Sequence, residues 1–229
     1  GWIGHSSYNS SQLSWMWKRH AGFDVVSYMG NGIAGRAVKH SLGRAPEMMW
    51  VKTRGLFGST GGWRVYHKGL NGGSSAENYG MYINTSAAQY LSSSSWNETV
   101  PTSTHFTVGT NSEVNGAGNY FIAMLFASVE GVSKVGYYAG QNTDLTLNLG
   151  FSPRYMFIKQ TNGTHVWMCF DTHRGITTGN VPHMHFNSQG AQTTDRDWLD
   201  PVANGIKINS SGLPEVNNAG NSYIYYAHA

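Results

Sequence analysis

The chain has few charged residues and a single cysteine. Lys, Arg, Asp and Glu make up 12% of its 229 residues, and the formal net charge at pH 7 is +3 with neutral histidine. The basic residues are scattered, whereas a nucleic-acid-binding protein needs a basic patch or stripe, so no nucleic-acid partner is expected. Cys169 alone excludes an intrachain disulfide, and its apolar surroundings predict a buried side chain. No run of eighteen apolar residues is present, so no membrane insertion is expected.

The most informative feature that is present is an internal repeat. Residues 42–52 align without a gap with residues 149–159, in the pattern L-G-x-[AS]-P-x-x-M-[WF]-[VI]-K. A second block, residues 114–119, aligns with residues 216–221. Trp63 likewise aligns with Trp167, and each is followed three residues later by another aromatic residue. A repeat of about one hundred residues is the size of a domain rather than of a solenoid turn.

The repeat predicts two modules, residues 22–130 and residues 131–229. No Gly-, Ser- or Pro-rich linker separates them, so we expect rigid coupling. Residues 13–17 stand in the same register before Gly22 as residues 122–126 do before Gly131. Residues 1–21 are therefore expected to carry the last strand of a preceding module, in a C-terminal piece of a longer polypeptide; the alternative is a short arm that pairs with a neighbour. Trp15 and Trp17 would share one face of that strand and pack outside the two modules.

Short β-branched and aromatic runs, punctuated by Gly-Asn, Asn-Gly and Gly-Gly, predict an all-β chain. We expect two tandem β-sandwich modules of the jelly-roll or lectin-like kind. The repeated Ala-Gly-Asn predicts a turn with positive φ at Gly118 and Gly220. One helical turn is expected near residues 85–88. The clearest expected strands are residues 23–28, 47–53, 62–67, 120–129, 156–160, 166–170, 205–209 and 222–227.

Residues 30–35 match the dinucleotide-binding pattern G-x-G-x-x-G. In that site a helix begins at the third glycine, so that its N-terminus meets the pyrophosphate. Here residues 36–40 alternate in polarity like a strand. The stretch is therefore interpreted as a glycine-rich hairpin, and no cofactor is expected.

Two segments could bear ligands for a metal or catalytic groups. His183 and His185 have the spacing of two ligands on one face of a strand, but a pair without a third ligand is more typical of ordinary polar strand residues. Residues 195–200 contain three aspartates, which could bind Ca²⁺ or act as a glycosidase pair. The alternative is a solvated loop anchored by Trp198, and it is favoured because the first module repeats the aromatic at Trp96 but not the charges. No metal site and no catalytic set are expected.

Aromatic side chains are the remaining candidates for binding. Trp63 and Trp167 could form a platform for sugar rings, but their repetition favours an equivalent, buried position between sheets. Tyr79, Tyr82 and Tyr90 do not repeat and lie in the irregular middle of the first module. Because loops carry recognition more often than cores do, these three tyrosines are the candidate ligand surface.

The repeated blocks resemble a family of bacteriophage virion proteins, mostly from environmental and marine tailed phages, that are tail-fibre or tail-associated proteins. This resemblance covers essentially the whole chain. It implies lectin-type or jelly-roll modules near the C-terminus of longer proteins, and it brings no set of catalytic or ligand residues. The motifs that carry it are WKR at residues 17–19, GFDVVSY at 22–28, GNG at 30–32, HSLGRAPEMMWVK at 40–52, GW at 62–63, VYH at 65–67, FTVGT at 106–110, GVSKVG at 131–136, DT at 171–172, RGI at 174–176 and YI at 223–224.

The expected function is that of a non-enzymatic virion structural protein, part of a tail fibre or appendage that contacts the host surface. Its partners would be other virion proteins, further copies of itself and a host-surface glycan; symmetric fibres are usually trimers. One alternative is a capsid or tail decoration protein with no receptor role. Another is an enzyme that degrades surface polysaccharide, for which two carboxylates facing a groove would be required.

Overall fold

The computed structural model describes residues 17–19, 21–54, 61–210 and 214–229. In this part of the chain there are sixteen strands, two α-helices of four residues each and two short 3₁₀ helices. The strands form four antiparallel sheets, a larger and a smaller one in each half of the chain. The prediction of an all-β, sandwich-type fold is confirmed. No helix of the described residues is long and apolar enough to cross a membrane.

The first half contains a six-stranded and a two-stranded sheet. The larger sheet has, in spatial order, β1 (Phe23–Met29), β8 (Tyr120–Phe126), β3 (Met48–Thr53), β4 (Arg64–His67), β5 (Tyr79–Tyr82) and β6 (Tyr90–Leu91). The smaller sheet pairs β2 (Arg36–Lys39) with β7 (His105–Val108). The short helices η1 (Leu70–Gly73), η2 (Ala76–Asn78), α1 (Ser93–Trp96) and α2 (Ser112–Asn115) lie in the connections.

The second half has the same arrangement, but its larger sheet has five strands and its smaller sheet has three. Its larger sheet has the order β9 (Ser133–Ala139), β16 (Ser222–His228), β11 (Tyr155–Gln160), β12 (Met168–Asp171) and β13 (Met184–His185). Its smaller sheet has the order β10 (Leu145–Asn148), β15 (Gly205–Ile208) and β14 (Leu199–Val202). The order β1-β8-β3-β4-β5 thus recurs as β9-β16-β11-β12-β13.

Equivalent hydrogen bonds accompany the equivalent strands. The Tyr28 hydroxyl donates to the carbonyl oxygen of Val114 at 2.6 Å, and the Tyr138 hydroxyl donates to that of Val216 at 2.6 Å. Gly118 and Gly220 both have positive φ, 76° and 84°, as predicted. The sequence repeat is therefore a repeat of structure, while the division between residues 130 and 131 stays a prediction.

Two local predictions are wrong. Residues 36–39 do form a strand, but residues 30–35 are not a hairpin, because β1 and β2 belong to different sheets. Residues 85–88 contain no helical turn. That segment instead runs along the second half, where the carbonyl oxygen of Ser86 accepts a hydrogen bond from the Lys159 ammonium at 3.4 Å and Gln89 N–H donates to the carbonyl oxygen of Thr161 at 2.7 Å.

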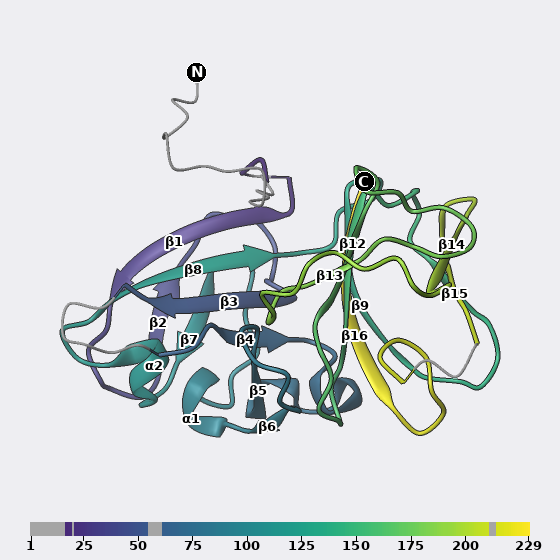
Figure 1. Ribbon diagram of the computed structural model, residues 1–229. Helices are drawn as coiled ribbons and strands as arrows, with labels where there is room; N and C mark the ends of the chain where they lie inside the picture. The colour runs from purple at the N-terminus through teal and green to yellow at the C-terminus, as the bar shows by residue number, and fades with distance from the viewer. Residues whose placement is uncertain (1–16, 20, 55–60, 211–213) are drawn as a thin grey trace, which may run out of the picture.

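The larger sheet of the second half is buried on both faces. Along β11, Met156 and Ile158 belong to the core between the two sheets of their own half, whereas Tyr155 and Phe157 belong to the core shared with the first half. This follows from the alternation of side chains along a strand. Figure 1 shows this sheet standing between the first half and strands β14 and β15. The two halves therefore form one packed unit.

Candidate functional site

The two larger sheets meet through equivalent positions. Trp50 and Phe157, which align in the sequence repeat, lie with ring centroids 5.8 Å apart. Phe126 and Tyr226 add a second contact across the interface, at 5.2 Å. Contact between a residue and its own equivalent is what an approximate two-fold axis produces.

Trp63 and Trp167 are the matching tryptophans on the two sides. Trp63 N–H donates to the Asn84 side-chain oxygen at 3.0 Å, and Trp167 N–H donates to the Asn187 side-chain oxygen at 3.0 Å. Trp167 is fully buried, and its indole N–H donates to the carbonyl oxygen of Tyr82 at 3.0 Å. Trp63 is only half-buried. The prediction that both are largely buried is confirmed for Trp167, which lies between the halves rather than between its own two sheets, and holds only in part for Trp63, which packs against the core but stays partly exposed.

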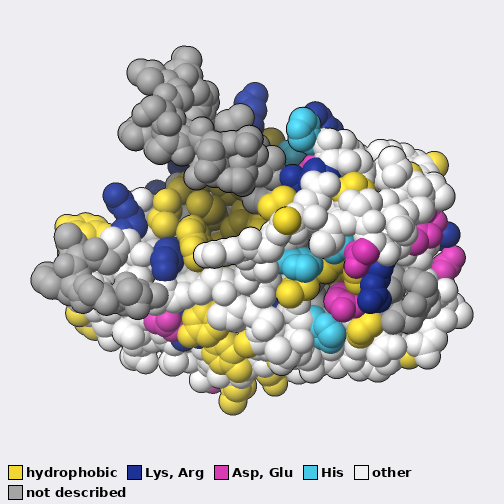
Figure 2. Space-filling view, viewed as in Figure 1, with side chains coloured by type: hydrophobic (Ala, Val, Ile, Leu, Met, Phe, Trp, Pro, Cys, Tyr) yellow, Lys and Arg dark blue, Asp and Glu magenta, His cyan; other side chains and the backbone are white. Residues whose placement is uncertain are grey.

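An open groove of about 330 Å³ lies beside Trp63. None of the lining residues that the structure describes carries a charge, and Asn84 supplies an amide among otherwise apolar and aromatic side chains. Figure 2 shows hydrophobic side chains gathered in a hollow of the molecular surface, in the region of β1 and β8. The groove is lined by Trp17, Trp50, Trp63, Ile83, Asn84, Met124 and Phe186.

Trp17, one of the residues that line the groove, packs against both halves of the chain. Its ring centroid lies 5.7 Å from Phe23 and 5.8 Å from Phe126 in the first half, and 5.9 Å from Tyr155 in the second. The prediction that Trp17 packs outside the two modules is therefore wrong. Trp15 and the rest of the expected strand, residues 13–16, lie outside the described residues.

The predicted tyrosine surface is in part a polar cluster around Arg64. The Tyr82 and Tyr90 rings are stacked at 5.6 Å, and the Arg64 guanidinium lies 4.4 Å from the Tyr82 ring centroid and 5.2 Å from that of Tyr90. Tyr79 is not part of this stack; its carbonyl oxygen accepts a hydrogen bond from the Trp96 indole at 3.2 Å. All three tyrosines are half-buried. The structure thus brings two of the three together.

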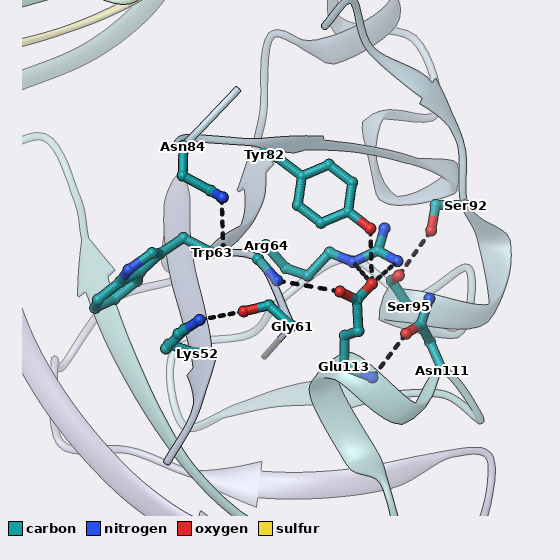
Figure 3. Close-up of polar contacts among 11 residues, drawn as sticks. Lys52, Gly61, Trp63, Arg64, Tyr82, Asn84, Ser92, Ser95, Asn111 and Glu113 are labelled. Atoms are coloured by element: carbon teal, nitrogen blue, oxygen red, sulfur yellow. Dashed lines mark hydrogen bonds and ion pairs between the residues drawn. The ribbon is translucent and has the colours of Figure 1, made fainter. Parts of the chain in front are cut away.

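Glu113 joins this cluster from α2 (Figure 3). Its carboxylate accepts hydrogen bonds from the Tyr82 hydroxyl at 2.7 Å, from Arg64 Nε at 2.8 Å and from Gly62 N–H at 3.2 Å. Burial alone would raise the pKa of Glu113, but the bond from Tyr82 and the charge of Arg64 outweigh it and lower that pKa. Burial and the bond to Glu113 raise the pKa of Tyr82 to about 12. Glu113 is thus an ionised carboxylate whose oxygens already accept several hydrogen bonds. Such a group is suited to holding neighbouring segments in place and not to proton transfer.

The cluster does not recur in the second half. Arg64 pairs across the sheet with Tyr82, and the equivalent pair is Met168 with His185. Glu113, one residue before the repeated Val114, aligns with Glu215 before Val216. Reasoning from sequence missed Arg64 and Glu113. Arg64 follows the repeated Trp63 and becomes Met168 in the second module, so a comparison of the neighbours of repeated residues could have found it, whereas Glu113 recurs as Glu215 and gave no such signal.

His183 and His185 lie close together, with ring centroids 5.5 Å apart. Both nitrogens of His183 are engaged, Nδ1 with the carbonyl oxygen of Val181 at 3.2 Å and Nε2 with the Thr193 hydroxyl at 2.7 Å. Within the described residues no set of three or more His, Cys, Asp or Glu side chains could hold a metal ion. Burial and the neighbouring His183 lower the pKa of His185. The pair therefore resembles packed strand histidines rather than metal ligands.

Two of the three aspartates of residues 195–200, Asp197 and Asp200, make contacts with the segment of β15. Trp198 is buried, as is Trp96 at the aligned position of the first half. Asp197 accepts a hydrogen bond from the Asn209 amide at 2.6 Å, and Asp200 forms an ion pair with Lys207 at 2.7 Å. These contacts support the interpretation of the segment as a loop anchored by Trp198. The last two residues of the segment, Leu199 and Asp200, are the first two of β14.

Cys169 is fully buried in β12. Burial raises the pKa of its thiol to about 12. A thiol that stays protonated at neutral pH is a poor nucleophile, so the residue acts as a small apolar core side chain.

A family model described as a domain of unknown function, DUF7483, matches residues 8–229. The chain belongs to this family. The match runs through both halves as a single unit, which agrees with the core that they share. Comparisons with curated proteins and with solved structures gave no match.

Proposed function

We propose that this protein is a non-enzymatic structural component of a bacteriophage virion, part of a tail fibre or similar appendage that contacts the host surface. The proposal starts from the resemblance of the repeated motifs to tail-associated virion proteins. It places the protein in the virion, with other virion proteins and further copies of itself as partners.

The observation that carries the proposal is the burial of the second half's larger sheet on both faces. Because Tyr155, Phe157 and Trp167 pack against the first half, the two modules cannot swing about a hinge without exposing aromatic surface to water. Each such side chain contributes roughly 2–3 kcal/mol when buried. A rigid pair of β-sandwiches suits a load-bearing shaft or tip.

The polysaccharide-degrading alternative needs two carboxylates that face a groove. The described lining residues of the aromatic groove include no carboxylate, and Glu113, Asp197 and Asp200 are engaged in structural contacts. These observations favour a structural role. The decoration-protein alternative has the same fold requirements and differs only in where the protein sits on the virion.

Gold-labelled antibodies against the purified protein, applied to intact virions and imaged by electron microscopy, test the proposal. We expect label on tail fibres or another appendage. Label confined to the capsid would replace the proposal with a decoration role, and virions without label would overturn it. Release of reducing sugar from capsular polysaccharide or lipopolysaccharide by the purified protein would instead support the enzymatic alternative.

A further inference from the structure

The two sides of the module interface differ in how far they enclose their matching tryptophans. On one side the Trp167 ring is fully enclosed, and its indole N–H is bonded to Tyr82 of the other half. On the other side Trp63 has the same backbone anchor, an asparagine side chain, but its ring is half-buried beside the open groove. Figure 3 shows the Trp63 ring pointing away from the Arg64–Glu113 cluster, so the polar network does not cover it.

We propose that this groove binds a neutral pyranose ring of a host-surface glycan, with Trp63 as the stacking platform. The inference rests on the proposed function and names the class of ligand that would be recognised. Flat aromatic surfaces match the apolar face of a sugar ring, and a nearby side-chain amide can bond its hydroxyls. Asn84, whose oxygen holds the Trp63 backbone, provides that amide at the rim of the groove.

The lining selects among ligand classes. Because the described residues that line the groove carry no charge, a sialic acid, a phosphate or another anion would lose water there without gaining a counter-charge. The groove volume of about 330 Å³ is at the lower end of small-ligand sites, which is suitable for one or two sugar rings. A second copy of the chain would need to bury about 800 Å² per partner, far more than seven lining residues provide.

A buried polar group in the same lining also points to a ligand. Trp50 is only 6% exposed, and its indole N–H has no hydrogen-bond acceptor among the described residues. A buried donor without an acceptor costs about 1–3 kcal/mol, so such groups are uncommon. An acceptor brought within reach of this N–H by a bound ligand would remove that cost.

The test is saturation-transfer NMR with the full chain and three uncharged probes: methyl α-D-glucopyranoside, methyl β-D-galactopyranoside and N,N′,N″-triacetylchitotriose. We expect saturable binding of at least one probe. Trp63→Ala should weaken it by at least about tenfold, whereas Trp63→Phe, which keeps an aromatic face, should retain most of it. Tyr120→Ala is the matched control, because it removes an aromatic ring that is 46% exposed and lies outside the groove lining.

Several outcomes would overturn the inference. The inference is wrong if none of the probes binds, if Trp63→Ala binds a probe as well as the wild-type protein does, or if the protein self-associates and Trp63→Ala abolishes this self-association. Circular dichroism and urea unfolding of Trp63→Ala check that the variant is folded. Virion labelling is independent of these results, so a failed glycan site would leave the proposed function standing.

Discussion

His67 in β4 donates its Nε2 hydrogen to the backbone carbonyl oxygen of Tyr225 in β16, at 3.2 Å across the module interface. Its Nδ1 accepts from Gly69 N–H at 3.0 Å, which sets the neutral tautomer. The side chain is fully buried. His67 therefore connects the turn at Gly69 in the first module to the larger sheet of the second module. Only the uncharged imidazole can make both hydrogen bonds.

This contact predicts a loss of stability in acid. Complete burial lowers the pKa of His67 to about 3, from an ordinary value of 6.5. The unfolded chain therefore binds more protons below pH 6.5, so the stability that His67 contributes is present above that pH and is lost as pH falls toward 3. We expect its share of the unfolding free energy to fall by about 3 kcal/mol between pH 7 and pH 4.

Urea unfolding at a series of pH values measures this slope. The control is His67→Gln, whose amide can still donate to Tyr225 but does not titrate in this range. Other groups titrate equally in both proteins, so the difference between the two slopes isolates His67. Identical slopes would contradict the assignment.

The two matched tryptophans should differ in their contribution to stability. Trp167→Ala empties a fully buried site and removes a hydrogen bond to Tyr82, so we expect a loss of about 3–5 kcal/mol. Trp63→Ala should cost about half as much, because the ring is already partly in water. Chemical denaturation of both variants makes the comparison, and equal costs would show that the groove closes in solution.

Breaking the Arg64–Glu113 pair from one side should be costly. Arg64→Met places in the first module the residue that the second module has at the equivalent position, and it leaves the Glu113 carboxylate without its cation. We expect a loss of about 3 kcal/mol and a rise in the pKa of Glu113. The double variant Arg64→Met/Glu113→Gln should recover part of the loss, because no uncompensated charge then remains. A double-mutant cycle with no coupling would contradict this view of the cluster.

Asn115 and Asn217 should have matching energetic roles. Both are fully buried, and each side chain makes three hydrogen bonds to the backbone of its own module. Replacement of either by Ala removes those bonds and leaves buried backbone groups unpaired, which should cost about 2–3 kcal/mol in each case. The exposed Asn180→Ala is the control, with an expected change within about 0.5 kcal/mol. A large difference between Asn115→Ala and Asn217→Ala in thermal unfolding would argue against equivalent modules.

The sequence alone was sufficient for the all-β class and for the repeat. Strand character is local, since it follows from alternation and from glycine-rich turns, and a repeated motif such as that around Trp50 and Phe157 is visible without any structure. Positive φ at Gly118 and Gly220 was predictable for the same reason. The hairpin expected at residues 30–35 was wrong because strand pairing is not local, and nothing near Gly30 shows that β1 and β2 belong to different sheets.

Only the tertiary structure decided how the two modules pack and which aromatic side chains stay accessible. A sequence repeat predicts the same surroundings for two aligned residues. Trp63 nevertheless borders an open groove, while Trp167 is enclosed by the other module. Arg64 and Glu113, 49 residues apart, meet because β4 and α2 converge in space. Periodicity determines which face of a strand a side chain occupies, but what covers that face depends on contacts between distant parts of the chain.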